Sequence, residues 1–146
     1  MSRLYPSRPI VGVGIVVWHL DRVLLIKRGK PPREGQWSLP GGAQQLGETL
    51  AETAARELME ETGLKAAIGE IIATLDLIDR DDEGAVRHHY TLVDFTAEAT
   101  STALRAGDDA ADANWFELSE LATLELWSET RRIIDLAAAK RQTYRP

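Results

Sequence analysis

The stretch GGAQQLGETLAETAARELMEETGL, residues 41–64, combines a glycine pair, a helix-start signal and five glutamates. Thr49 is followed three residues later by Glu52, the spacing of a capping box, so a helix is predicted to begin here. It is predicted to run to about Thr62 and to end at the following glycine, which favours the left-handed C-cap conformation. The two adjacent glycines before the helix are expected to form a tight turn.

The glutamates of this helix gather on one side of it. Glu57, Glu60 and Glu61 fall within five residues, and at about 100° per residue they share an arc. Like charges four residues apart destabilise an isolated helix by roughly 0.2–0.5 kcal/mol. The cluster is therefore either a solvated face or a site for a divalent cation, and Arg56 is the only cation inside the helix. The neighbouring apolar strip, predicted to pack on a sheet, comprises Leu50, Ala54 and Leu58.

A hard divalent cation suits such a cluster. Magnesium prefers oxygen ligands and is commonly held by one or two carboxylates together with waters and substrate phosphate oxygens. Glu57 and Glu61 point the same way and offer two carboxylates, and the glycine pair lets a backbone carbonyl approach them. Bound magnesium would neutralise the cluster, attract an anionic substrate and activate water. A centre that cleaves pyrophosphates is the function that this pattern indicates.

Properties of the whole chain narrow the classes of function. Its 146 residues, 44 % hydrophobic and 27 % charged, predict a single domain spanning residues 1–146, with a core at about 9–139. The absence of cysteine excludes disulfides, zinc–thiolate sites and thiol nucleophiles. A net charge of −6 argues against nucleic acid as a partner. The apolar run near the N-terminus is too short to cross a membrane, so a soluble, cytoplasmic protein is expected.

Hydrophobic patterning predicts strands on both sides of the helix. The Val- and Ile-rich run Ile10–Trp18 and the run Val23–Lys27 are predicted to form a hairpin. The mixture of strands and two main helices predicts an α+β fold, in which helices sandwich a mixed sheet. Further strands are predicted at 37–39, 66–78, 88–97 and 115–116, a polar loop at 101–113, a helical turn at 119–121 and a last helix at 128–141 with Ile133, Ile134, Leu136 and Ala137 on its apolar side.

The complete spacing of the glutamate segment resembles the signature of the Nudix family. That signature, the Nudix box, is G-x5-E-x7-R-E-U-x-E-E-x-G-U, where U is a bulky aliphatic residue. The run-in Trp37–Gly41 and the later segment Trp115–Leu118 also look like this family, so the resemblance covers about Pro9 to Ala139. Nine restricted positions match over 23 residues without a departure: Gly42, Glu48, Arg56, Glu57, Leu58, Glu60, Glu61, Gly63 and Leu64.

The resemblance implies an α/β/α sandwich and a hydrolase that uses Mg²⁺, or Mn²⁺, to cut the pyrophosphate link of a nucleoside diphosphate joined to another group. It implies Glu57 and Glu61 as metal ligands and Glu60 as a further ligand, direct or through water. It also implies metal coordination by the Gly41 carbonyl. Glu48 is expected to hold the geometry of the loop and helix and to contact a metal through water.

Catalysis involves further residues by the same resemblance. Arg56 is expected to orient the glutamates by ion pairing. The general base is either a glutamate of the Nudix box or an acid of the late loop GDDAADANW. Among Asp108, Asp109 and Asp112 we select Asp109, because family members tend to carry an acid near this position. A solvated turn is the alternative for this residue, since aspartate is shorter than the usual glutamate.

Two residues outside the box are candidates for binding the substrate. Arg28 ends the second strand and can hold a phosphate bidentately, although it can also be a plain surface charge. Trp37 can stack on a base, although an aromatic residue of a small domain is more often part of the core. Arg33 is predicted at the surface, Trp127 in the core, and one of the adjacent histidines His88 and His89 packed inward.

The surroundings of the box look most like the ADP-ribose pyrophosphatase-like branch, which implies ADP-ribose as substrate and AMP and ribose 5-phosphate as products. One departure concerns a proline about fifteen residues past the box in some ADP-ribose-specific members, where this chain has Ile78-Asp79-Arg80. A MutT-type enzyme that sanitises nucleoside triphosphates is the alternative, and a non-catalytic nucleotide-binding module is an alternative of another class. The resemblance also implies a possible homodimer.

Overall fold

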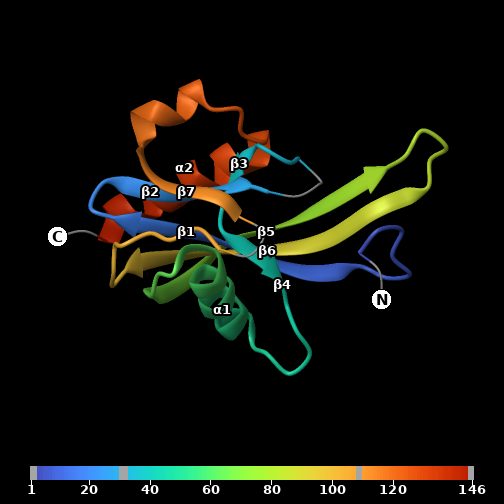
Figure 1. Cartoon of the computed structure of the whole chain (residues 1–146), viewed down its shortest axis with the longest axis horizontal. Helices are drawn as coiled ribbons and strands as arrows, with labels where there is room; N and C mark the ends of the chain where they lie inside the picture. The colour runs from blue at the N-terminus through green and yellow to red at the C-terminus, as the bar shows by residue number, and fades with distance from the viewer. Residues whose placement is uncertain (1–2, 30–32, 108–109, 145–146) are drawn as a thin grey trace.

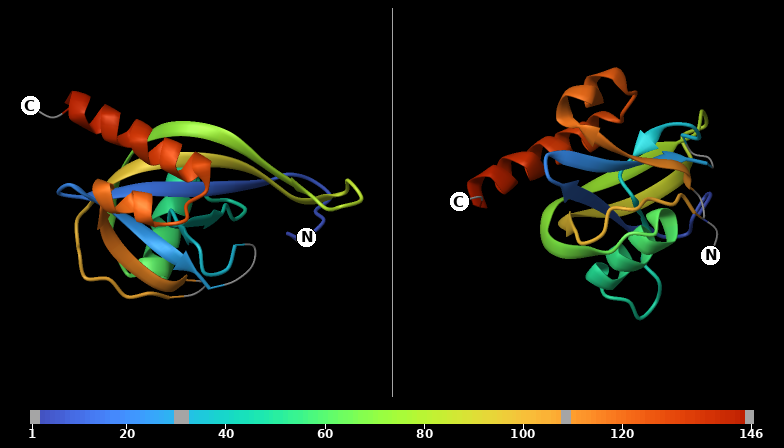
Figure 2. Two further views of the ribbon diagram at one scale, coloured as in Figure 1. Left: turned by 90° about the horizontal axis from the view of Figure 1, so that it is seen from above. Right: turned by 60° about the vertical axis from the view of Figure 1, so that its left-hand side comes forward.

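A seven-stranded mixed sheet lies between two helices that cover its opposite faces (Figure 1 and Figure 2). The computed structural model describes residues 3–29, 33–107 and 110–144. The predicted sandwich of helices around a mixed sheet is confirmed. The elements are β1 (Ile10–His19), β2 (Arg22–Arg28), β3 (Trp37–Ser38), β4 (Gly41–Ala43), α1 (Leu50–Thr62), β5 (Ala66–Arg80), β6 (Val86–Ala99), β7 (Ala110–Glu117), the 3-10 helix η1 (Leu118–Thr123) and α2 (Ser128–Tyr144).

Strand β1 is the centre of the sheet. The main strand order is β3-β2-β1-β6-β5, with β4 also paired to β1 and β7 to β2. β1 runs parallel to β6, and the other pairings of the described strands are antiparallel. Val13, Ile15 and Val17 are buried on its α1 face and Val16 and Trp18 on its α2 face, because helices cover both faces. The predicted hairpin of β1 and β2 is confirmed.

Helix α1 begins and ends as predicted. The Thr49 hydroxyl accepts the N–H of Glu52, the Glu52 carboxylate accepts the N–H of Thr49, and Gly63 has a φ of 72°. Ala54 and Leu58 are fully buried in one core cluster between α1 and the sheet. This packing fixes the helix against β1 and turns its glutamate side toward β4.

Helix α2 packs on the other face of the sheet. Ile133, Ile134 and Ala137 are buried in a second core cluster, together with Trp18 of β1. Leu136, predicted on the same apolar side, is exposed instead. It lies about 60° outside the arc that the three buried residues span, so it points past the sheet.

Two segments differ from their sequence predictions. Gly41 and Gly42, predicted to form a tight turn, belong to strand β4, which pairs with β1. Part of the predicted loop at 101–113 is strand β7, which begins at Ala110 and pairs along β2. Both strands depend on hydrogen bonds to a distant partner, and their own short or polar sequences carry little periodicity.

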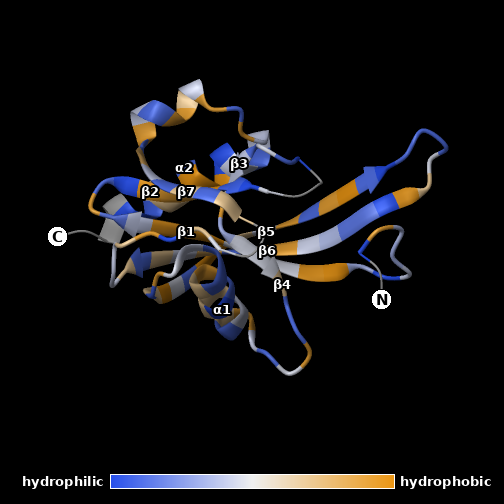
Figure 3. Cartoon of the chain, viewed as in Figure 1, coloured by the Kyte–Doolittle hydropathy of each residue, from blue (hydrophilic) through white to orange (hydrophobic). Residues whose placement is uncertain are grey.

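The long hairpin of β5 and β6 extends beyond both helices (Figure 2), and its turn is hydrophilic (Figure 3). The N-terminal segment is held against it, because the Tyr5 hydroxyl donates to Asp81 at 2.7 Å and the Tyr5 N–H donates to the Arg87 carbonyl at 2.8 Å. No helix within the described part of the chain is long and apolar enough to span a membrane.

Candidate active site

Arg56 is the centre of a hydrogen-bond network on the exposed side of α1. Its Nη1 donates to Glu57 at 2.8 Å and to Glu60 at 3.2 Å. Its Nη2 donates to the carbonyl oxygen of Ala43 at 3.0 Å, which joins α1 to β4. One guanidinium group therefore restrains two glutamates of the cluster and the strand beside them.

The same guanidinium holds Glu48 in the loop before α1. Nε and Nη2 of Arg56 bind the two carboxylate oxygens at 2.6 and 2.9 Å, a bidentate pair. Glu48 also accepts the N–H of Gln45 and the hydroxyl of Thr53. The Arg56 hydrogen bond, the largest cause, lowers the pKa of Glu48 to about 2. Because both oxygens are engaged by protein groups, the geometry favours a bracing role for Glu48.

Glu57 lies against the backbone of β4. A Cβ placed on Gly42 would collide with the Glu57 carboxylate, so glycine at this position lets the carboxylate lie here. Burial, the largest cause, raises the pKa of Glu57, and the hydrogen bond from Arg56 opposes this effect. The carboxylate is thus partly removed from water, and its negative charge is not fully compensated.

Glu61 is the most buried of the three glutamates, with 5 % of its surface exposed. Its Oε1 accepts the N–H of Gly41 at 2.7 Å. A Cβ on Gly41 would collide with the carbonyl oxygen of Val13, so this strand position also requires glycine. The two glycines of β4 therefore let the backbone and two carboxylates of α1 come together.

The chemistry of this donor set fits a hard divalent cation. Glu57, Glu60 and Glu61 supply carboxylate oxygens beside the Gly41 backbone, and a cation would stabilise the partly buried charge of Glu57. Within the described ranges, no three Asp, Glu, His or Cys side chains already form a metal-binding group. The carboxylates instead contact Arg56 and the Gly41 N–H, so a cation would share or exchange these contacts.

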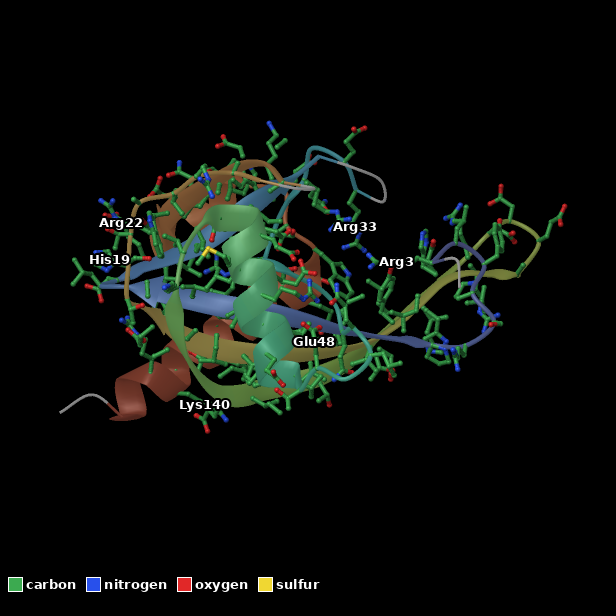
Figure 4. The ribbon with its side chains drawn as sticks, turned by 60° about the horizontal axis from the view of Figure 1, so that its bottom comes forward. Arg3, His19, Arg22, Arg33, Glu48 and Lys140 are labelled. Carbon is green, nitrogen blue, oxygen red and sulfur yellow. The ribbon has the colours of Figure 1, made fainter. Side chains whose placement is uncertain are left out.

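A cavity of about 820 Å³ opens beside the glutamates and continues along the sheet. Arg3, Arg28 and Arg33 line it as well. Figure 4 shows Arg3 and Arg33 approaching the space beside α1 from the N-terminal segment and from the loop after β2. The cavity therefore joins a carboxylate cluster to a set of cations, an arrangement suited to a phosphate ligand that carries a metal ion.

Arg28 lies at the end of β2, as predicted, and lines the cavity. Arg33 was predicted as a surface residue, and it is exposed, but it also lines the cavity and its guanidinium lies 4.6 Å from the ring centre of Trp127. Burial, first, and then the charge of Arg28 lower the pKa of Arg33. An anion in the cavity beside Arg33 would offset this effect on its charge.

The aromatic candidates are partly confirmed as core residues. Trp37 packs edge-on against Phe116, with ring centres 5.0 Å apart, and it also lines the cavity. Trp127 is only partly buried, and it faces Arg33 rather than packing entirely into the core. His88 is packed as predicted, with Nδ1 at 2.9 Å from Asp79. Trp37 can thus contact a ligand from a fixed position.

Asp109, the predicted general base, lies outside the described residues, as does Asp108. Gly107, just before them, donates its N–H to the Glu61 carbonyl at 3.1 Å. Asp112 is exposed on β7. The assignment of Asp109 as the base stays a prediction.

Sequence reasoning missed Asp94 of β6. Its side chain lines the cavity on the face opposite α1 and is 5 % exposed. Burial raises its pKa to about 6, and the charge of Arg132 opposes this only in part. The signal in the sequence was a single carboxylate inside the apolar strand segment TLVDF.

Comparison with known proteins places these features in a family. The NUDIX domain matches residues 8–137 of this chain. An ADP-ribose pyrophosphatase of Methanocaldococcus jannaschii is 37 % identical over 122 residues, which cover 84 % of this chain and 69 % of that protein. Against three further curated relatives, the chain spans 43–55 % of their length.

Solved structures share the fold. The NUDIX domain of Shewanella oneidensis NrtR, complexed with ADP ribose, has a TM-score of 0.77 and 26 % identity, covering 93 % of this chain and 90 % of that one. A MutT NUDIX hydrolase from Burkholderia pseudomallei has a TM-score of 0.77 and 30 % identity, covering 89 % and 98 %.

Proposed function

The chain belongs to the Nudix family of hydrolases, which act on phosphorus-containing acid anhydrides, and from this premise we propose that it cleaves ADP-ribose into AMP and ribose 5-phosphate with Mg²⁺. The observation that carries the proposal is the cavity that joins the glutamate cluster of α1 to three arginines. The relative named for ADP-ribose hydrolysis and the neighbour complexed with ADP ribose support this substrate.

Glu57, Glu61 and the Gly41 backbone would hold the cation, with Glu60 as a further ligand at the exposed edge. When bound, Mg²⁺, or Mn²⁺ in its place, supplies charge neutralisation of the pyrophosphate and activation of water. Glu48 is then a brace that reaches the cation at most through water, because its oxygens bind Arg56, Gln45 and Thr53.

The side chains of the protein prepare the substrate for attack. Arg56 fixes Glu57 and Glu60 before any ligand arrives, so little ordering is needed during the reaction. Arg28 and Arg33 hold phosphate oxygens from the opposite side of the cavity. Trp37 offers a ring already fixed by Phe116, against which a base can stack.

A proton must leave the attacking water. Asp109 is our candidate for the group that accepts it, and the glutamates of α1 are the alternative acceptors. Asp109→Ala should lower kcat, with little change in KM, if Asp109 has this role. An unchanged kcat would transfer the role to the glutamates.

A MutT-type nucleoside triphosphate pyrophosphohydrolase is the second candidate. The similarity to the Burkholderia pseudomallei MutT NUDIX hydrolase favours it, as does the Ile78-Asp79-Arg80 segment in place of the proline of some ADP-ribose-specific enzymes. Both candidates use the same carboxylates and differ in the substrate group beyond the pyrophosphate.

Product analysis with Mg²⁺ distinguishes these functions. The substrates are ADP-ribose, dinucleoside polyphosphates, NADH, sugar nucleotides, and ordinary and oxidised nucleoside triphosphates, each tested with wild type and Glu61→Gln. Glu70→Gln is the control, because Glu70 is an exposed glutamate of β5 that does not line the cavity.

AMP from ADP-ribose, lost in Glu61→Gln and kept in Glu70→Gln, is the expected result. Turnover of triphosphates alone would select the MutT-type function. Folded wild type that turns over none of these compounds would refute both enzyme functions and favour a nucleotide-binding module.

A further inference from the structure

Two glycines of β1 open one end of the cavity. Val13 packs into the core on the α1 side, so alternation directs positions 12 and 14 toward the α2 side. A Cβ on Gly12 would press on Leu92, and a Cβ on Gly14 would collide with Oδ1 of Asp94. Without side chains at these two positions, the sheet surface itself becomes the floor of the cavity, and the Asp94 carboxylate lies directly on it.

Asp94 faces the cavity with little cover, and its carboxylate oxygens remain accessible from that side. The hydrogen bonds and ion pairs of the described residues include none to its carboxylate, and 5 % of the residue is exposed. The Arg132 guanidinium, the charge that acts on it, is itself hydrogen-bonded to Glu129 at 2.6 and 2.8 Å. A carboxylate in so confined a place loses part of its hydration, and a donor on a ligand in the cavity would compensate for that loss. Such a group is therefore expected to have a function.

The surroundings of Asp94 suit a flat, largely apolar group. Ile26, Leu39 and Leu75 line this end of the cavity, and Thr130 of α2 lines it with 8 % of its surface exposed. Apolar walls with a few fixed polar groups are typical of sites that bind a ring and determine its orientation. Phosphates do not suit this end, because the carboxylate would repel them.

We propose that Asp94 determines substrate specificity by accepting a hydrogen bond from an amino group on the nucleobase, with the Thr130 hydroxyl as a second polar contact. This inference rests on the proposed nucleotide substrate. An ionised carboxylate only accepts hydrogen bonds, so it favours adenine, which presents an amino group, over hypoxanthine, which presents a carbonyl oxygen at the same place. The hypoxanthine carbonyl oxygen and the Asp94 carboxylate would then be two acceptors facing each other, which disfavours binding.

Binding measurements in EDTA separate base recognition from hydrolysis. Isothermal titration calorimetry would compare ADP-ribose with its hypoxanthine analogue, and ATP with ITP, at pH 7.5. Wild type should prefer the amino-bearing member of each pair by about 10- to 100-fold, the range expected for a hydrogen bond to a charged group.

Two variants test the role of the carboxylate. Asp94→Asn should bind both members of a pair about equally, because an amide can present either its oxygen or its N–H₂. Asp94→Ala should weaken the amino-bearing nucleotide to the level of the hypoxanthine analogue. Asp135→Asn, which removes an exposed carboxylate of α2 paired with Arg131, should keep the wild-type preference.

An unchanged preference in folded Asp94→Asn and Asp94→Ala would overturn the inference, whatever the enzyme hydrolyses. A preference that depends on Asp94 while ADP-ribose is not hydrolysed would keep the inference and refute the proposed function. If none of the four nucleotides binds in EDTA, the inference is overturned, and the product assay with Mg²⁺ decides the proposed function separately.

Discussion

Replacing Asp94 with asparagine should change how the free energy of unfolding depends on pH. The carboxyl has an ordinary pKa of 3.8, and burial raises its pKa to about 6 in the folded protein. Well below pH 3.8 the Asp94 carboxyl is protonated in both the folded and the unfolded protein, so it does not destabilise the fold. As the pH rises from about 4 to 6, the unfolded chain loses the proton first, so ionisation favours unfolding.

The size of this effect follows from the two pKa values. Each tenfold difference in proton affinity corresponds to about 1.4 kcal/mol, so the values of 3.8 and about 6 give roughly 3 kcal/mol at neutral pH. Asparagine does not ionise, and the variant lacks this loss of stability. A buried amide has its own unfavourable free energy, but that contribution is the same at every pH.

Urea denaturation followed by tryptophan fluorescence, in EDTA at pH 4, 5, 6 and 7.5, measures the effect. The difference in free energy of unfolding, variant minus wild type, should rise by roughly 2.5 kcal/mol between pH 4 and pH 7.5, because the unfolded carboxyl is already partly ionised at pH 4. The other titrating groups are common to both proteins and cancel. A difference that stays constant across this range would show that Asp94 is solvated or paired in the folded state, and it would refute the reasoning.

Three further substitutions test α1 and its surroundings. Thr49→Ala removes the helix cap and should lower the free energy of unfolding by about 1 kcal/mol in urea denaturation; an unchanged midpoint would contradict the capping role. Arg56→Lys should lower kcat by about 10- to 100-fold in the product assay, since lysine cannot reproduce the bidentate bond to Glu48, and full activity would dismiss Arg56 as an organiser. Gly42→Ala should remove detectable hydrolysis and weaken Mg²⁺ binding by calorimetry, because its Cβ would displace the Glu57 carboxylate; normal Mg²⁺ affinity would count against Glu57 as a ligand.

Features with local causes were predictable from the sequence. The start of α1 depends on Thr49 and Glu52, its end on Gly63, and its buried strip on helical spacing, all within about fifteen residues. The contact between Arg56 and Glu60 follows from their separation by four positions. Such short-range geometry is the same in almost any protein that carries these residues, so their spacing in the sequence is sufficient to predict these features.

Features that depend on strand pairing were not predictable in this way. Asp94 lies on Gly14 because β6 runs parallel to β1 in one particular register, and neither strand determines that register alone. Arg33 reaches the cavity because the loop after β2 meets the segment before α2, where Trp127 lies. Strand β4 likewise exists only through β1. The alternation of glycine at positions 12 and 14 was visible, but its meaning required the neighbouring strand.

The parallel pairing of β1 and β6 also has a consequence for how the chain folds. Ile10 pairs with Tyr90, so the central pairing closes a loop of about eighty residues, and contacts of such separation slow folding. During synthesis, the apolar segment of β1 must wait for β6 to leave the ribosome, and until then it is a β-prone stretch open to aggregation. Gly14 and the Asp94 carboxylate that lies on it come together only when β1 and β6 pair. The end of the cavity that we propose for the base is therefore among the last parts of the molecule to form.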